Sequence, residues 1–109
     1  MATAYKVLGQ VAPAATTATA VYTVPSATEA VVSSVAVCNR AGTAATFRLS
    51  VRPDGASLAN QHYLVYDATL AGNDTIILTI GVTIDATDVL EAYASSGDLT
   101  FQAYGSEIT

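Results

Sequence analysis

Short runs of alternating apolar and polar residues, separated by turn residues, recur along this chain and constrain its fold more than any other feature. Residues 46–52 show the pattern most cleanly, because Phe47, Leu49 and Val51 alternate with polar residues. A period of two places apolar side chains on one face of a β-strand. The Pro-Asp-Gly sequence that follows at 53–55 has the residue types of a tight turn. Helix signals are nearly absent, so we expect an all-β protein.

The alternating runs predict about eight strands at nearly even spacing. They cover residues 5–11, 21–24, 29–39, 46–52, 61–67, 75–80, 89–94 and 99–104, and the sixth continues through Val82 and Ile84 after a bulge or bend at Gly81. This pattern predicts an antiparallel β-sandwich, jelly-roll or Ig-like, in preference to a closed barrel. The length suits a single domain over residues 1–109, with residues 12–20 as an extended N-terminal arm or loop.

The run at 29–39 differs from the others because both of its faces are apolar. Strict alternation places Val31, Val35 and Val37 on one face and Val32, Ala36 and Cys38 on the other. A strand with two apolar faces is normally covered on both sides. We therefore expect the second sheet to cover one face and a loop or a partner to cover the other.

The composition is rich in apolar residues and poor in charged ones. Hydrophobic residues make up 51% of the chain, charged residues 12%, and the mean hydropathy is +0.42. A domain of this size buries only about two-thirds of its unfolded surface, and soluble domains usually carry about 25% charged residues. The surface is therefore either tiled with neutral Ala, Thr and Ser or largely covered by other protein, as in a subunit of a larger assembly.

Charge and hydropathy argue against several kinds of partner. The net charge is −5 and only four residues are basic, too few for a nucleic-acid interface. No apolar run approaches the roughly 18 residues of a membrane span. Residues 1–10 lack the charged leader and apolar core of a signal peptide, so we expect synthesis in a cytoplasm. The single cysteine, Cys38, lies in an apolar run and is predicted to be a buried free thiol.

Candidate chemistry is sparse. His62 is the only histidine, and Ser57 and Asp67 lie near it in sequence without a nucleophile motif around them. Three turns carry oxygen ligands that calcium would accept if the loops converged at one end of the sandwich, although Asp and Asn are also ordinary turn residues. These turns contain Asp85, Thr87 and Asp88; Asn73 and Asp74; and Asp98. We expect no catalytic residue, no cofactor and no metal, and hence a protein that is not an enzyme.

Arginine and tyrosine are the more informative residue types. Arg48 and Arg52 lie two pleats apart on one face of a predicted strand, and we expect them to pair with a neighbouring subunit or with Glu29, Glu91 or Glu107. The chain has six tyrosines and no tryptophan, which favours protein contacts over sugar stacking. The predicted interface residues are Arg48, Arg52, Tyr5, Tyr22 and Tyr104.

Several short segments along most of the chain together resemble small virion proteins of tailed phages, particularly cyanophages and phages of marine bacteria. The segments are KVLGQ at 6–10, YTVP at 22–25, VRP at 51–53, YLVYD at 63–67, DVL at 88–90, YASS at 93–96 and YGSEIT at 104–109. The resemblance implies a β-sandwich structural component of the particle, located in the virion after synthesis in the host cytoplasm. It implies oligomers, often three-fold, and no catalytic residues.

The resemblance and the composition together predict a capsid decoration (cement) protein that binds the major capsid protein shell, with a homotrimer as the favoured oligomer. Two alternatives stay open. One is a tail, baseplate or fibre component of a phage, and the other is a carbohydrate-binding module for host attachment. No nucleic acid or membrane partner is expected.

Overall fold

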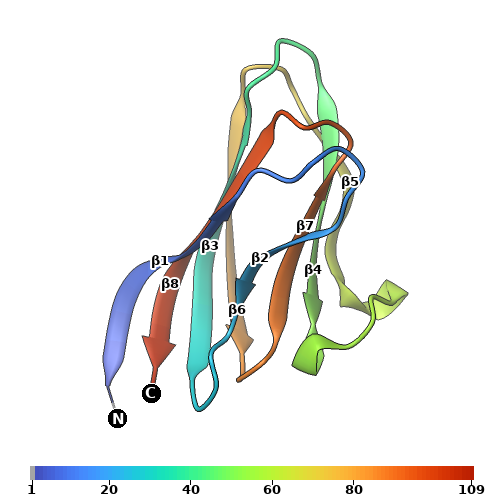
Figure 1. Cartoon of the computed structure of the whole chain (residues 1–109). Helices are drawn as coiled ribbons and strands as arrows, with labels where there is room; N and C mark the ends of the chain where they lie inside the picture. Colours follow the sequence, from blue (N-terminus) through green and yellow to red (C-terminus); the bar gives the residue numbers. More distant parts are fainter. Residues whose placement is uncertain (1) are drawn as a thin grey trace.

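The computed structural model describes residues 2–109 and contains two four-stranded antiparallel sheets packed face to face (Figure 1). Two short 3-10 turns, η1 (Pro53–Gly55) and η2 (Asn60–His62), lie between the fourth and fifth strands. The strands are β1 (Thr3–Val11), β2 (Thr19–Thr23), β3 (Glu29–Asn39), β4 (Ala45–Arg52), β5 (Tyr63–Leu70), β6 (Thr75–Ile84), β7 (Val89–Ala94) and β8 (Leu99–Ile108). The all-β sandwich predicted from the alternating runs is confirmed, with β3 and β7 at the predicted bounds.

The strand order identifies the kind of sandwich. One sheet has the order β1-β8-β3-β6 and the other β2-β7-β4-β5. The first strand therefore pairs with the last, the second with the seventh, the third with the sixth and the fourth with the fifth. This is the order of a long antiparallel hairpin rolled into two layers, the jelly roll. Of the two sandwich types that the sequence left open, the structure has the jelly roll.

The core is built from alternate residues of both sheets. The only two phenylalanines of the chain, Phe47 on β4 and Phe101 on β8, meet edge to face with ring centroids 6.0 Å apart. Leu49, Leu90 and Leu99 are fully buried around them. The alternation predicted for residues 46–52 is confirmed, since Phe47 and Leu49 are buried and Val51 packs against the core.

The predicted face assignment of residues 29–39 is wrong at Val31 and Val32. The pairing of β3 with both neighbours shifts between Val32 and Ser34. Against β8, Ser33 is the extra residue, and it breaks strict alternation along β3. Val32 therefore faces the core together with Val35 and Val37, while Val31 faces outward. The predicted irregularity at Gly81 is confirmed, because Gly81 has a φ of +57° next to this shift.

The outer side of β3 is less covered than expected. Val31, Ala36 and Cys38 are all half-buried. The prediction that Cys38 is buried is wrong, because its side chain lies on the outer face of its sheet. Within residues 2–109, no loop or second layer covers these three side chains. The sequence predicted a loop or a partner over this face, and the partner stays a prediction.

The two long sides of the sandwich differ. On one side β1 runs against β2, and a Cβ added at Gly9 would lie 2.0 Å from the carbonyl oxygen of Val21. Residues 12–18 then connect the two sheets, with Pro13 buried and the Thr16 amide bonded to the Ala94 carbonyl at 2.8 Å. The predicted arm, residues 12–20, thus lies on its own chain here and ends in β2.

Replacing Gly9 by alanine is expected to destabilise the fold because the new methyl group overlaps the Val21 backbone. Overpacking of this kind typically costs about 1–3 kcal/mol. Gly42→Ala is the matched control, since its Cβ would meet only the Asn73 side chain at 3.7 Å. Thermal and urea unfolding of both variants check the prediction. Equal stability of the two variants would contradict the close approach of β1 and β2.

Candidate functional site

The outer faces of the two sheets differ in charge, and this contrast defines the candidate interaction surfaces. The outer face of β2-β7-β4-β5 carries Arg48, Arg52, Asp67 and Glu91, which form two ion pairs. The four strands β1, β8, β3 and β6 contain three charged residues, Lys6, Glu29 and Glu107. Of these three residues, Lys6 and Glu107 bind each other on the inner side of the sheet.

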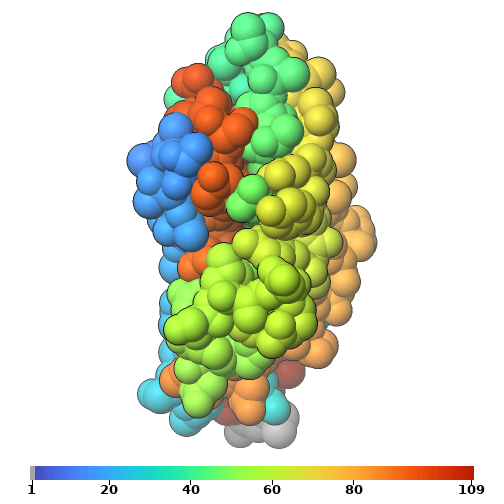
Figure 2. Space-filling model, turned by 90° about the vertical axis from the view of Figure 1, so that its right-hand side faces the viewer, coloured from blue at the N-terminus to red at the C-terminus, as the bar shows by residue number. Residues whose placement is uncertain are grey.

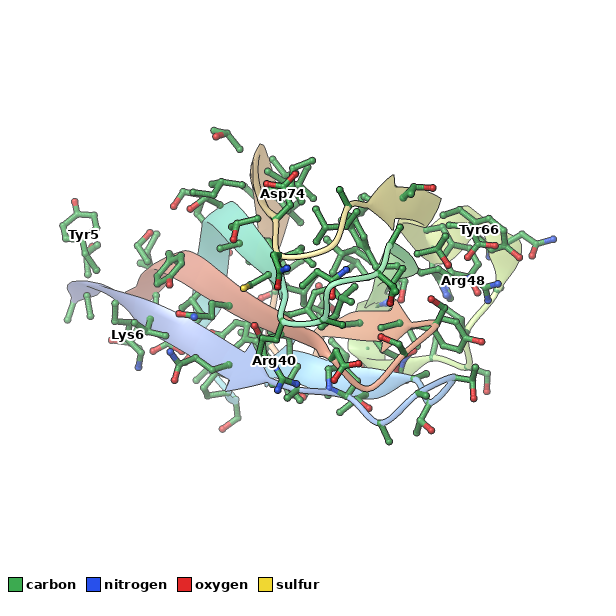
Figure 3. All side chains as sticks on the ribbon, turned by 90° about the horizontal axis from the view of Figure 1, so that it is seen from above. Tyr5, Lys6, Arg40, Arg48, Tyr66 and Asp74 are labelled. Carbon is green, nitrogen blue, oxygen red and sulfur yellow. The ribbon has the colours of Figure 1, made fainter. Side chains whose placement is uncertain are left out.

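Arg48 is held by a carboxylate and two aromatic rings. Its guanidinium donates to Asp67 through Nε at 2.6 Å and through a terminal nitrogen at 3.2 Å. It also lies 4.3 Å from the ring centre of Tyr66 and 4.4 Å from that of Tyr93. The hydrogen bonds from Arg48 hold the pKa of Asp67 below its usual range. Figure 3 shows Arg48 and Tyr66 together at one side of the molecule. Arg48 is therefore engaged within its own chain.

Arg52 is also engaged within the chain. Its Nε donates to Glu91 at 3.0 Å, and it donates to the carbonyls of Gly55 and Ala56 at 3.1 and 2.9 Å. Glu91 is buried, so Arg52 both neutralises a buried carboxylate and ties down the loop after β4. Glu91 is one of the partners that the sequence predicted. Asp67, the partner of Arg48, was not among them.

Tyr22 belongs to a polar cluster between the sheets. Its hydroxyl donates to Glu107 at 2.6 Å, and Lys6 binds the other oxygen of Glu107 at 2.8 Å. The bonds from Lys6 and Tyr22 lower the pKa of Glu107, and burial, together with the bond to Glu107, raises the pKa of Tyr22. Tyr22 is buried, so its hydroxyl and most of its ring are used within the fold.

The outer face of β1-β8-β3-β6 is nearly free of charge. Register places Tyr5, Val31, Gln102 and Tyr104 on this face, with Ser and Thr residues between them. Within these four strands, this face carries one Asp, Glu, Lys or Arg side chain, that of Glu29, the first residue of β3. Three large apolar side chains stand out from it: Tyr5 is 86% exposed, Val7 48% and Ile77 67%. We call this surface the uncharged face.

A shallow hollow of about 370 Å³ lies on the uncharged face. Tyr5 and Tyr104 line it together with Val31 and the extra residue Ser33. The Tyr104 hydroxyl is bonded to Gln102, which also binds Gln10. Tyr5 projects from β1 on the opposite side of the molecule from Arg48 (Figure 3). Of the five predicted interface residues, Tyr5 and Tyr104 lie together on the uncharged face, Arg48 and Arg52 lie on the opposite face, and Tyr22 is buried.

The remaining candidate residues serve the turns that contain them. His62 accepts the Ala59 amide on Nδ1 at 3.0 Å, and no hydrogen bond joins it to Ser57 or Asp67 in the described chain. The carboxylate of Asp88 accepts the amides of Asp54 and Asp85, both at 2.8 Å. Asp85 and Asp88 follow β6, whereas Asn73 and Asp74 precede it, so these turns lie at opposite ends of the sandwich. The loop convergence that a calcium site would require is therefore not met by these two pairs.

Compared with known proteins, the chain matches no family model and no curated protein. Residues 2–109 contain no helix long and apolar enough to cross a membrane. Over the same residues, no three His, Cys, Asp or Glu side chains are grouped as metal ligands would be.

Replacing Arg52 by methionine is expected to destabilise the fold, because Glu91 would be left buried without its cation. The Glu91 side chain is only 9% exposed in this pair, and loss of one partner from such a pair costs about 1–3 kcal/mol. The double variant Arg52→Met/Glu91→Leu should recover much of the loss. Arg48→Met is the control and should cost less, since its partner Asp67 is well exposed. Urea unfolding at neutral pH measures all three; equal losses for Arg52→Met and Arg48→Met would contradict the burial argument.

Glu107 should contribute stability that depends on pH. Its pKa is lowered in the fold by Lys6 and Tyr22, so as the pH falls the unfolded chain is protonated first, near its ordinary value of about 4.3. The contribution is therefore present above that pH and is lost as the pH falls through the folded pKa. The stability difference between wild type and Glu107→Gln should be largest at pH 7 and shrink toward pH 3. A difference that stays constant over this range would disagree with the pKa shift.

Proposed function

We propose that this chain is a non-enzymatic structural protein of a tailed-phage virion, and specifically a capsid decoration protein that binds the shell of major capsid protein. The observation that carries the proposal is the uncharged face of β1-β8-β3-β6, with Tyr5 and Val7 exposed on an otherwise acidic chain. The resemblance of the sequence to small phage virion proteins supplies the choice of partner.

The charge contrast between the two faces supports the uncharged face as the contact surface. Removing a charge from water is costly unless it is paired, and interface cores are depleted of charged residues. The arginines of the opposite face are already paired with Asp67 and Glu91. The uncharged face can be buried without separating any ion pair, and Tyr5 offers an aromatic anchor of the kind that dominates protein interfaces.

The size of the face suits one partner surface. Four strands spaced about 4.8 Å apart and about 30 Å long present a flat area of roughly 600 Å². A standard interface buries about 800 Å² on each partner. Burial of apolar area at about 25 cal/mol per Å² would drive attachment. The added contacts would join neighbouring shell subunits and increase the resistance of the shell to internal pressure. A homotrimer at three-fold sites of the shell is the arrangement that the resemblance favours.

Two other functions would use the same fold. A tail, baseplate or fibre component would need the same uncharged contact surface but far fewer copies in the particle. A carbohydrate-binding attachment module would use exposed aromatic rings, and Tyr66 is 59% exposed with Tyr63 packed edge to face against it at 4.9 Å. Arg48 already stacks on Tyr66, which argues against that ring as a sugar platform.

The proposal predicts that the double variant Tyr5→Asp/Val7→Asp folds normally but attaches about tenfold or more weakly to shells of major capsid protein. Both side chains are exposed, so the fold does not depend on them. Leu58→Asp is the matched control, because Leu58 is 40% exposed outside the uncharged face. Co-sedimentation of each purified variant with shells that lack the protein gives the measurement.

Quantitative mass spectrometry of purified particles separates the alternatives. Copies as numerous as the capsomer junctions would support decoration, and a few copies per particle would favour a tail or baseplate position. Absence from the particle would overturn the proposal. Attachment of Tyr5→Asp/Val7→Asp at wild-type strength would leave a virion role standing and exclude the uncharged face as the contact.

A further inference from the structure

Each sheet of the sandwich ends in edge strands, and most of them are protected against pairing with another chain. Natural proteins protect such edges with charges, bulges or short strands. β2 has only five residues, and its register shifts against β7. β1 carries Lys6 and a register shift between Val7 and Gly9. β5 carries Asp67 at a φ of +51° and two register shifts against β4.

β6 is the exception. It is the outermost strand of β1-β8-β3-β6, runs for ten residues as TIILTIGVTI, and contains neither a charged residue nor a proline. Its residues 75–79 pair with β3 in unbroken register, and the irregularity at Gly81 comes only afterwards. Ile77 is 67% exposed and Ile76 38%. The first half of β6 is thus a regular apolar edge with free backbone groups, which is the kind of edge that accepts another strand.

The side of the sandwich beside β6 is incompletely closed. Leu78, Ile80 and Val82 point toward the core but stay partly exposed, and Val65 and Ala68 of β5 do the same across the gap between the sheets. Figure 2 shows this side, with residues 53–70 toward the viewer and β6 along the right-hand edge. Extension of the sheet beyond β6 would cover apolar surface as well as the free backbone groups.

We propose that β6 pairs antiparallel with β6 of a second copy of this chain, across a two-fold axis at Ile77. The residues 75–79 read Thr-Ile-Ile-Leu-Thr, a pattern of polar and apolar residues that is the same in both directions. With Ile77 opposite Ile77 of the second copy, Thr75 lies opposite Thr79 and Ile76 lies opposite Leu78. Each pair then lies on one face of the joined sheet.

This register is favourable because directly opposed residues are the unit of sheet stability. Pairs of β-branched residues and Thr–Thr pairs stabilise a sheet, whereas like charges directly opposite destabilise it. The strand brings no charge to the contact, so the pairing sets no like charges directly opposite each other. No other edge strand of the sandwich offers a regular, uncharged stretch that matches itself in this way.

The dimer would contain one continuous eight-stranded sheet, four strands from each copy. It would place the two uncharged faces side by side and leave Tyr5 and Val7 free at the far edges. The inference is independent of the virion proposal, since it uses only the edge strand. It predicts a two-fold dimer and not the trimer that the resemblance favours.

Sedimentation velocity of the full chain over a wide concentration range tests the inference. We expect a monomer–dimer equilibrium for wild type and a dissociation constant raised about tenfold or more by Ile77→Lys, which sets two like charges opposite each other. Val7→Lys is the matched control, because it adds the same charge on the same face at the opposite edge, and it should dimerise as wild type does. Thr79→Lys is a second variant that adds a charge to the β6 edge, and it should also weaken the dimer. Circular dichroism verifies that each variant is folded.

A wild-type monomer at all concentrations would overturn the inference, and so would a trimer or a dimer that Ile77→Lys leaves intact. None of these three outcomes would affect the shell-binding test with Tyr5→Asp/Val7→Asp, so the two proposals fail separately.

Cysteine cross-linking tests the register. In a Cys38→Ser background, Ile77→Cys should cross-link with itself on mild oxidation. Thr75→Cys should cross-link with Thr79→Cys when the two variants are mixed, and much less with itself. Efficient self-linking of Thr75→Cys with none at Ile77→Cys would overturn the two-fold register centred on Ile77.

Discussion

The contact between the two sheets is the constraint on which the rest of the structure depends. Phe47 and Phe101 meet edge to face at its centre, one from each sheet, and leucines and valines fill the space around them. Each strand must present alternate apolar residues to this thin core. Where the chain gains a residue, as at Ser33, a bulge restores the phase, so that Val32 and Val35 both reach the interior.

The distribution of charge follows from this arrangement. All four basic residues find acceptors within the chain: Lys6 at Glu107, Arg40 at the Gly97 carbonyl, Arg48 at Asp67 and Arg52 at Glu91. The Lys6 contact lies on the β1–β2 side, and the Arg40 contact joins the loops that follow β3 and β7. The Arg48 and Arg52 contacts lie on the outer face of β2-β7-β4-β5. The uncharged face and the β6 edge are left without such contacts. Two surfaces that can be buried without separating an ion pair remain, and our two proposals rest on them.

Much of the fold could be predicted from the sequence, because each strand carries its own signal. Turn residues bound the strands, and alternation identifies the core positions of β4 without knowledge of its neighbours. β1 shows where this reasoning ends. Its alternating Tyr5 and Val7 have the pattern of a core face, yet they point outward while Lys6 points toward Glu107 and β2. The orientation of an edge strand depends on what lies above it, which local pattern does not contain.

For the candidate site too, the sequence determined one part and the tertiary structure decided the other. The sequence determined the residue types available for contact, namely few charges, six tyrosines and no metal-ligand cluster. It did not show that Arg48 meets Asp67, 19 residues away, because that pair depends on the register of β4 against β5. Nor did it show that β6 is an exposed edge. Local propensity and alternation decide which residues form strands, whereas the order of strands decides which backbone groups and side chains stay free. That order is set by packing between segments far apart in the chain.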